Sequence, residues 1–124
     1  MSNQDRPLSP HMSVYRWPIT MTLSILHRLT GAGLSLGFVV LALWLSSASS
    51  GKEPYTETID LLSSTVGRLV LIALLFSFFF HFCNGVRHLV WDTGRGFERQ
   101  QSNVSAGLVI VMTVVLSFVF WLFV

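Results

Sequence analysis

Three long stretches of this sequence contain almost no ionisable side chains, and they constrain the fold more than any other feature. A helix needs about 20 apolar residues to cross the roughly 30 Å hydrocarbon core of a bilayer. The uncharged stretches are Leu29–Leu45, the first half of Leu69–Trp91, and Val104–Val124. We therefore predict an all-α, polytopic membrane protein whose three transmembrane helices cover about residues 18–46, 68–91 and 103–124.

Composition supports one membrane domain over residues 1–124 and excludes several other classes. Charged residues make up 11% of the chain, against roughly 25% in a soluble domain. The apolar runs are continuous and do not alternate, which argues against barrel strands. The single cysteine, Cys83, excludes an internal disulfide. The eight basic residues are scattered, so no nucleic-acid partner is expected.

The segments outside the spans predict an orientation. Residues 1–17 contain Pro7 and Pro10 and should be extended. Residues 46–67 form a polar loop whose only basic side chain is Lys52, with Arg68 directly after it, and Ser102 or Asn103 should cap the third span. Six arginines lie on the N-terminal side and around the second loop: Arg6, Arg16, Arg28, Arg87, Arg95 and Arg99. The positive-inside rule therefore places the N-terminus on the cytoplasmic or matrix side.

The N-terminus lacks the apolar stretch of a signal peptide and the pattern of a transit peptide. We expect a multi-pass protein of the bacterial inner membrane, with the mitochondrial inner membrane as the alternative.

His81 is the deepest ionisable residue. It lies thirteen residues after Arg68 and ten before Trp91, which is close to mid-membrane at about 1.5 Å per residue. Ser77, Gly85 and His88 share its helical face. An ionisable residue inside a span costs about 2.5–3.5 kcal/mol and indicates function. His81 could be a haem-iron ligand or a hydrogen-bonding contact to a neighbouring helix; for two imidazole ligands, the second must come from another chain.

A second group of residues marks the beginning of the first span. It consists of Trp17, Met21, Ser24, Ile25 and Arg28, at spacings that predict one helical face. Apolar walls with a few polar groups are typical of a ligand pocket. The alternative is an interfacial tryptophan with an arginine that reaches the head groups, but this does not explain Ser24 and the neighbouring His27.

These two groups should converge at one membrane face. His27 and Arg28 enter on the first span, while Arg87 and His88 leave on the second. A cationic rim there would suit the propionates of a haem held by His81. Arg87 alone has another interpretation, since a basic side chain at the end of a span can reach the head-group layer. The third span has few polar residues and is predicted to be scaffold, and Gly33 and Gly37 predict a close helix contact.

Three motifs resemble the cytochrome b subunits of succinate dehydrogenase. They are residues 6–11 (RPLSPH), residues 24–31 (SILHRLTG), and residues 81–88 (HFCNGVRH) followed by Asp92. The resemblance covers nearly the whole chain. It implies a heteromeric helical bundle that anchors an iron–sulfur subunit and a flavoprotein subunit to the lipid bilayer.

The resemblance also implies roles for single residues. His81 matches the axial ligand of haem b, with the other ligand supplied by a second small anchor subunit. His27, Arg28 and His88 match the neighbourhood of the haem propionates. Ser24 and Arg28 match residues at the ubiquinone head group, with Trp17, Met21 and Ile25 as its apolar wall.

The chain itself carries no catalytic residue for succinate oxidation in this interpretation. It has no dinucleotide motif and no cysteine set for iron–sulfur clusters. Two alternatives remain open from the sequence: a haem-free structural anchor, and a small proton or transport subunit that uses His81 and His88 as a relay.

Overall fold

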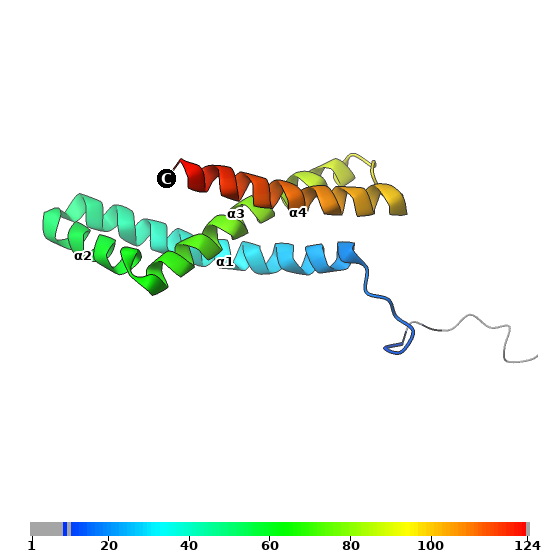
Figure 1. The fold of residues 1–124 in the computed structure, drawn as a ribbon, viewed down its shortest axis with the longest axis horizontal. Helices are drawn as coiled ribbons and strands as arrows, with labels where there is room; N and C mark the ends of the chain where they lie inside the picture. Colours follow the sequence, from blue (N-terminus) through cyan, green and yellow to red (C-terminus); the bar gives the residue numbers. More distant parts are fainter. Residues whose placement is uncertain (1–8, 10, 124) are drawn as a thin grey trace, which may run out of the picture.

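The computed structural model describes residues 9 and 11–123, and helices make up most of this part of the chain (Figure 1). The four helices are α1 (Ile19–Ser50), α2 (Lys52–Ser63), α3 (Thr65–Asp92) and α4 (Arg99–Leu122). Of these, α1, α3 and α4 are long and apolar enough to cross a membrane. The prediction of an all-α protein with three transmembrane helices is confirmed.

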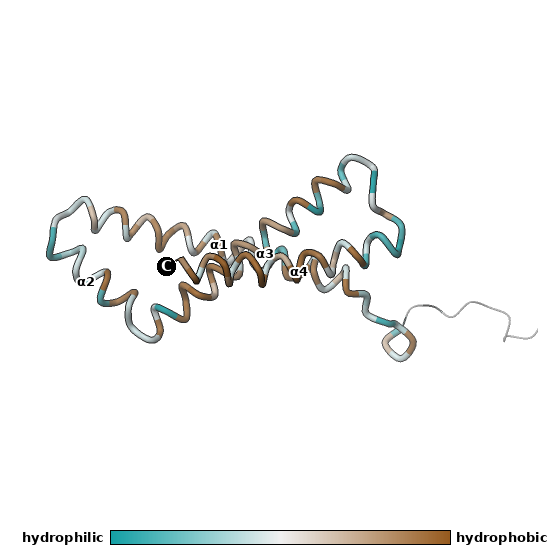
Figure 2. Tube along the Cα trace, turned by 45° about the horizontal axis from the view of Figure 1, so that its top comes forward, coloured by the Kyte–Doolittle hydropathy of each residue, from teal (hydrophilic) through white to brown (hydrophobic). Residues whose placement is uncertain are grey.

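Helix α3 lies between α1 and α4 and packs against both. The beginning of α1, the end of α3 and the beginning of α4 lie at one end of the molecule (Figure 1). We call this the arginine-rich end, because Arg16, Arg95 and Arg99 lie there. Helix α2 lies at the opposite end. Hydrophobic residues occupy the middle of the helices, with hydrophilic residues toward both ends (Figure 2).

The polar loop predicted over residues 46–67 is wrong, because most of this segment is helical. Helix α1 continues to Ser50, Gly51 turns the chain at φ 115°, and α2 follows for 12 residues. A positive φ of this size favours glycine. Ile59 and Leu62 of α2 face a recess that α1 and α3 also line. The few apolar residues of this polar segment therefore pack a short helix against the bundle.

Helix boundaries also differ from the expectation. Pro18 is the N-cap of α1, with extended backbone, and α1 itself begins at Ile19. Ser102 and Asn103 lie inside α4, whose N-cap is Glu98, so neither caps the third span. Residues 12–14 form a turn in which the amides of Val14 and Tyr15 donate to the His11 carbonyl. The N-terminal segment is therefore not extended there, while Pro7 and Pro10 lie outside the described residues.

The buried core is small and connects the three long helices. Leu23, Ala106 and Val109 are buried together, with Phe80 and Cys83 packed against them. Many large apolar side chains are exposed along the helices, as expected where lipid or other helices cover the surface. The predicted close contact at two glycines holds only for Gly37, where a Cβ would lie 2.8 Å from a methyl of Leu74. Nothing lies within 4 Å of such a Cβ at Gly33.

Candidate functional site: a histidine cluster between α1 and α3

Three histidines meet between α1 and α3, and we call them the histidine cluster. The rings of His27 and His81 are stacked, with centroids 3.9 Å apart and planes 10° apart. The ring of His88 lies 5.1 Å from that of His27. All three side chains are half-buried. The structure thus brings together the three histidines that the sequence predicts at one membrane face.

The hydrogen bonds of His81 indicate which of its ring nitrogens is the donor. Its Nδ1 lies 3.1 Å from the backbone oxygen of His27 and 3.3 Å from the hydroxyl of Thr30. A carbonyl oxygen can only accept, so Nδ1 carries the proton and donates it. The Thr30 hydroxyl donates in turn to the carbonyls of Leu26 and His27. In the neutral imidazole with the proton on Nδ1, Nε2 has the lone pair, the arrangement that is usual for a metal-binding histidine.

Gly31 allows the His81 ring to lie close to the backbone of α1. A Cβ at this position would lie 3.0 Å from Cε1 of His81. An alanine there would have to displace the imidazole by a few tenths of an ångström. At Gly85, by contrast, a Cβ would lie 3.8 Å from Cε1 of His27, an ordinary contact. The glycine that the cluster itself requires is Gly31, on the helix opposite His81.

The stacking of His27 on His81 limits how a metal could bind. The lone pair of an imidazole nitrogen lies in the ring plane, so two rings stacked face to face cannot point lone pairs at one iron between them. Over the described residues, no group of three or more histidine, cysteine or acidic side chains has the geometry to hold a metal ion. The donor set of this chain therefore fits a haem iron that takes one imidazole here and its second ligand from elsewhere.

His27 carries an unused polar atom. Its Nδ1 is buried and has no hydrogen-bond partner among the described residues. A buried polar atom without a partner costs free energy of about 1–3 kcal/mol, so such an atom is suited to a ligand or a water. His27 thus has a group available for an acceptor such as a carboxylate.

The stripe predicted at the beginning of the first span is only partly a helical face. Trp17 precedes the helix, and its indole N–H donates to the Thr22 hydroxyl at 2.7 Å. It therefore does not continue the face of Met21, Ser24, Ile25 and Arg28, all of which lie on α1.

Ser24 and Arg28 keep their polar groups available. Ser24 is half-buried and Arg28 is exposed. Within the part of the chain that the structure describes, the Ser24 hydroxyl makes no side-chain hydrogen bond, whereas Ser35 on the same helix donates to the Gly31 carbonyl. Ser24 thus has a free donor one turn from Arg28.

Arg87 does not belong to the cationic rim that the sequence predicts, and it does not extend to the head groups. It is 5% exposed and faces α4. Its Nε donates to the Ser105 hydroxyl, Nη1 to the Asn84 side chain, and Nη2 to the carbonyl and hydroxyl of Ser102. Its guanidinium also lies 4.0 Å from the Trp91 ring centroid. Arg87 lies six residues after His81, which turns it about 240° around α3.

Sequence reasoning missed several residues that position these groups. Thr30 and Gly31 were part of a quoted motif, but no role was given to either. Asn84, Ser102 and Ser105 bind Arg87, and they were not singled out for that contact. A polar residue at i−3 from a span arginine is a signal for Asn84; the serines of α4 carry no local signal.

The fold defines a polytopic helical membrane protein with a histidine cluster between two of its long apolar helices. The chain belongs to the succinate dehydrogenase/fumarate reductase transmembrane subunit family, whose model matches residues 2–120. The family makes the chain a transmembrane component of an oxidoreductase complex, which argues against a separate transport subunit.

Named relatives come from bacteria and from mitochondria. The chain is similar to the succinate dehydrogenase cytochrome b556 subunit of Rickettsia felis, with 36% identity over 94% of this chain and 90% of the relative. The b556 subunit of Rickettsia prowazekii matches at the same identity and coverage. The mitochondrial cytochrome b560 subunit of Homo sapiens is also 36% identical, over 91% of this chain and 68% of the relative.

Proposed function

We propose that this chain is the haem b-binding membrane anchor of a succinate:ubiquinone oxidoreductase, with His81 as an axial ligand of the iron. The observation that carries the proposal is the hydrogen bond from Nδ1 of His81 to the His27 carbonyl, which leaves Nε2 free. When bound, the haem would supply a one-electron carrier. This chain's contribution is to hold the imidazole in one tautomer and one orientation.

A second small anchor subunit would supply the other axial ligand. The support is the stacked geometry of His27 and His81, in which the two rings cannot both direct a lone pair at one iron. The unpartnered Nδ1 of His27 suits a hydrogen bond to a propionate. Arg28 and His88 would supply further hydrogen-bond donors or positive charge to the haem propionates.

Ser24 and Arg28 would bind the ubiquinone head group at the arginine-rich end, as substrate. The Ser24 hydroxyl can donate to a quinone carbonyl, and the exposed guanidinium of Arg28 favours the negative charge that develops during reduction. Met21 and Ile25 lie on the same part of α1 and would form an apolar wall. Trp17 would contribute from the segment before the helix.

The same end would dock the soluble subunits. An iron–sulfur subunit and a flavoprotein subunit would oxidise succinate and deliver electrons there. The excess of arginine at this end favours the cytoplasmic or matrix side. We propose the bacterial inner membrane as the location, with the mitochondrial inner membrane as the alternative.

The haem assignment is tested with the purified complex and a His81→Ala substitution. We expect haem absorbance in the wild-type complex and its loss in the variant. His11→Ala is the matched control, because His11 is exposed and far along the chain from the cluster. Haem bands that survive in His81→Ala would refute the ligand assignment. A wild-type complex without such bands would favour the haem-free anchor.

The quinone assignment is tested with Ser24→Ala, and Ser35→Ala is its matched control. Both serines lie on α1, but only the Ser35 hydroxyl is already bonded to its own helix. We expect Ser24→Ala to lower quinone reduction at least tenfold while succinate oxidation by an artificial dye persists. Equal quinone kinetics in the two variants would contradict the assignment.

A further inference from the structure

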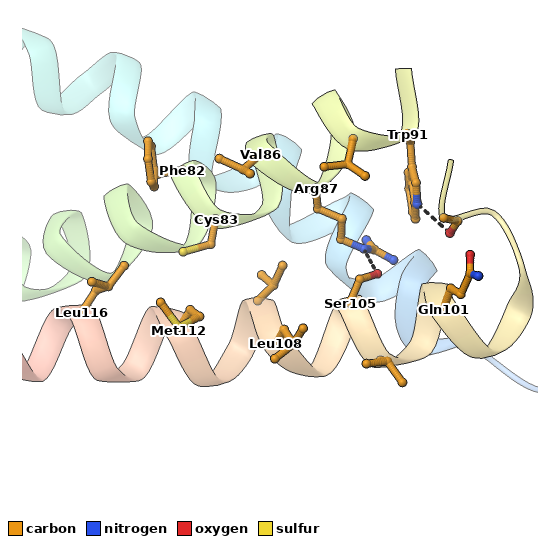
Figure 3. A pocket seen from close by; sticks show the side chains of 14 residues that line it. Phe82, Cys83, Val86, Arg87, Trp91, Gln101, Ser105, Leu108, Met112 and Leu116 are labelled. Carbon is orange, nitrogen blue, oxygen red and sulfur yellow. Dashed lines mark hydrogen bonds between the residues drawn. The ribbon is translucent and has the colours of Figure 1, made fainter. Parts of the chain in front are cut away.

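A second ligand-sized space lies on the other side of α3 from the histidine cluster. It is an open groove of about 630 Å³ between α3 and α4 (Figure 3). Val86 and Val90 line it, and they lie about 140° and 180° around the helix from His81. The groove and the histidine cluster therefore lie on different faces of one helix, and they adjoin only at Trp91, which lines the groove and whose ring lies 5.2 Å from that of His88.

The groove is long, and its walls are apolar. On α4 it extends from Gln101 to Leu116, which is about 22 Å at 1.5 Å per residue. Half of the hydrocarbon core of a bilayer is about 15 Å thick. Between its ends the walls include Phe82, Leu108 and Met112 (Figure 3). The groove therefore follows the membrane depth from the arginine-rich end past the middle of the bilayer.

A buried positive charge lines the groove at the arginine-rich end. Arg87 makes four hydrogen bonds, all to neutral acceptors. Guanidinium has five N–H groups, so one Nη1 hydrogen has no acceptor among the described residues. No carboxylate in the described part of the chain forms an ion pair with it. Hydrogen bonds satisfy its donors almost completely, but its charge has no counter-ion.

We propose that this groove binds an anionic phospholipid. The acyl chain lies along α3 and α4, and the phosphate lies at the mouth between Trp91 and Gln101, where it balances the charge of Arg87. One occupant then explains both the apolar walls and the unbalanced cation. Basic recesses between transmembrane helices on the positively charged side suit anionic head groups. A quinone tail would fill the walls but supply no anion.

The test uses the purified, delipidated complex and counts bound lipid by native mass spectrometry. Phosphatidylglycerol is the anionic probe and phosphatidylcholine the zwitterionic one. Val104→Trp obstructs the groove, because Val104 lines it and is 58% exposed. Val114→Trp is the matched control: Val114 is 53% exposed on the same helix and is not part of the groove lining.

We expect phosphatidylglycerol to bind at least tenfold more tightly than phosphatidylcholine. Val104→Trp should lower this affinity at least tenfold, and Val114→Trp should leave it unchanged. Arg87→Gln should remove the preference for the anionic lipid. If Arg87→Gln does not assemble, the Val104 and Val114 pair and the lipid comparison still decide the question.

Several results would overturn the proposal. Equal binding by Val104→Trp and the wild type would exclude the groove, and equal binding of the two lipids would exclude the role of charge. Displacement of the lipid by inorganic phosphate alone would indicate a simple anion site. Displacement by decylubiquinone would indicate a quinone tail, and no lipid binding by the wild type would indicate a protein neighbour over the groove. Haem absorbance of each sample reports separately on the histidine cluster.

Discussion

The two faces of α3 differ in how their polar side chains are bonded inside the membrane-spanning part of the protein. Toward α1, the histidine cluster leaves atoms unused: the buried Nδ1 of His27 has no partner, and Nε2 of His81 keeps its lone pair. Toward α4, Arg87 donates four hydrogen bonds to neighbouring groups. Each face keeps one buried nitrogen without a partner, Nδ1 of His27 on the first and Nδ2 of Asn84 on the second, but only the second face also carries a charge without a counter-ion among the described residues.

The comparison shows that satisfying the hydrogen bonds of a side chain and neutralising its charge are two different requirements. A polar atom without a partner costs about 1–3 kcal/mol and can be satisfied by a directional ligand. A charge that is already hydrogen-bonded needs only an anion nearby, and the exact geometry of that anion matters less. The α1–α3 face is therefore suited to a coordinated group, and the α3–α4 face to a loosely positioned one.

The largest expected effect comes from removing the arginine that connects α3 to α4. Arg87→Leu leaves the side-chain oxygen of the fully buried Asn84 without its donor and removes one of the two hydrogen bonds of the Ser105 hydroxyl. We expect a loss of about 3 kcal/mol in stability, measured as a lower unfolding temperature of the complex.

Arg28→Leu is the matched substitution on the other face. Arg28 is exposed, so the change in stability should stay within about 0.5 kcal/mol while quinone reduction falls. Equal destabilisation by the two variants would remove the distinction between the faces.

A smaller effect is expected where Gly31 of α1 meets His81. In Gly31→Ala, the new methyl lies within 3.0 Å of the imidazole unless the ring moves. We expect haem affinity to fall several-fold, measured by haem loss to an acceptor protein. Gly33→Ala is the control, since nothing lies within 4 Å of its Cβ, and it should gain up to about 1 kcal/mol of helix stability. Identical haem retention in both variants would show that the ring moves freely.

The smallest effect is expected from the second acceptor of the His81 proton. Thr30→Val removes a hydroxyl 3.3 Å from Nδ1, but the His27 carbonyl at 3.1 Å remains. We expect the hydrogen bonding that holds the His81 ring to weaken by about 0.5–1 kcal/mol. The measurement is a small shift of the haem midpoint potential. Ser35→Ala, which loses a hydrogen bond within α1, should leave the potential unchanged. Complete loss of haem in Thr30→Val would make the hydroxyl the main acceptor.

The three spans can be predicted because their length and lack of charge are local properties of the sequence. The hydrogen-bond partners of Arg87 cannot be predicted in this way. Its distance along the chain puts Arg87 near the end of a span, and the sequence therefore predicts a position beside the histidines. Spacing within α3 already turns Arg87 about 240° away from His81, but its partners Ser102 and Ser105 come from another helix. Tertiary contacts of this kind cannot be derived from the spacing within one span.

The geometry of the histidine cluster is also only partly predictable from spacing along the sequence. Spacing predicted that His27, His81 and His88 meet, since each has the right register on its own helix. It did not predict the carbonyl of His27 as the acceptor for His81 or the need for Gly31, because both depend on how closely α1 and α3 approach. Helix α2 was missed for a related reason: its polar residues are typical of a loop, and only packing of Ile59 and Leu62 against the bundle indicates otherwise.

The end of α1 that leads into α2 has a consequence for sidedness. Its last turns contain Ser47, Ser49 and Ser50, and each hydroxyl donates to a carbonyl of the same helix. The Ser46 hydroxyl in the same turns makes no hydrogen bond among the described residues, so a free serine hydroxyl occurs at both ends of α1; what distinguishes the other end is Arg28, one turn from Ser24. Under the proposed function, protons consumed in quinone reduction would enter from the same aqueous compartment that supplies the electrons. Turnover at this chain would then move no net charge across the membrane and would leave its voltage unchanged.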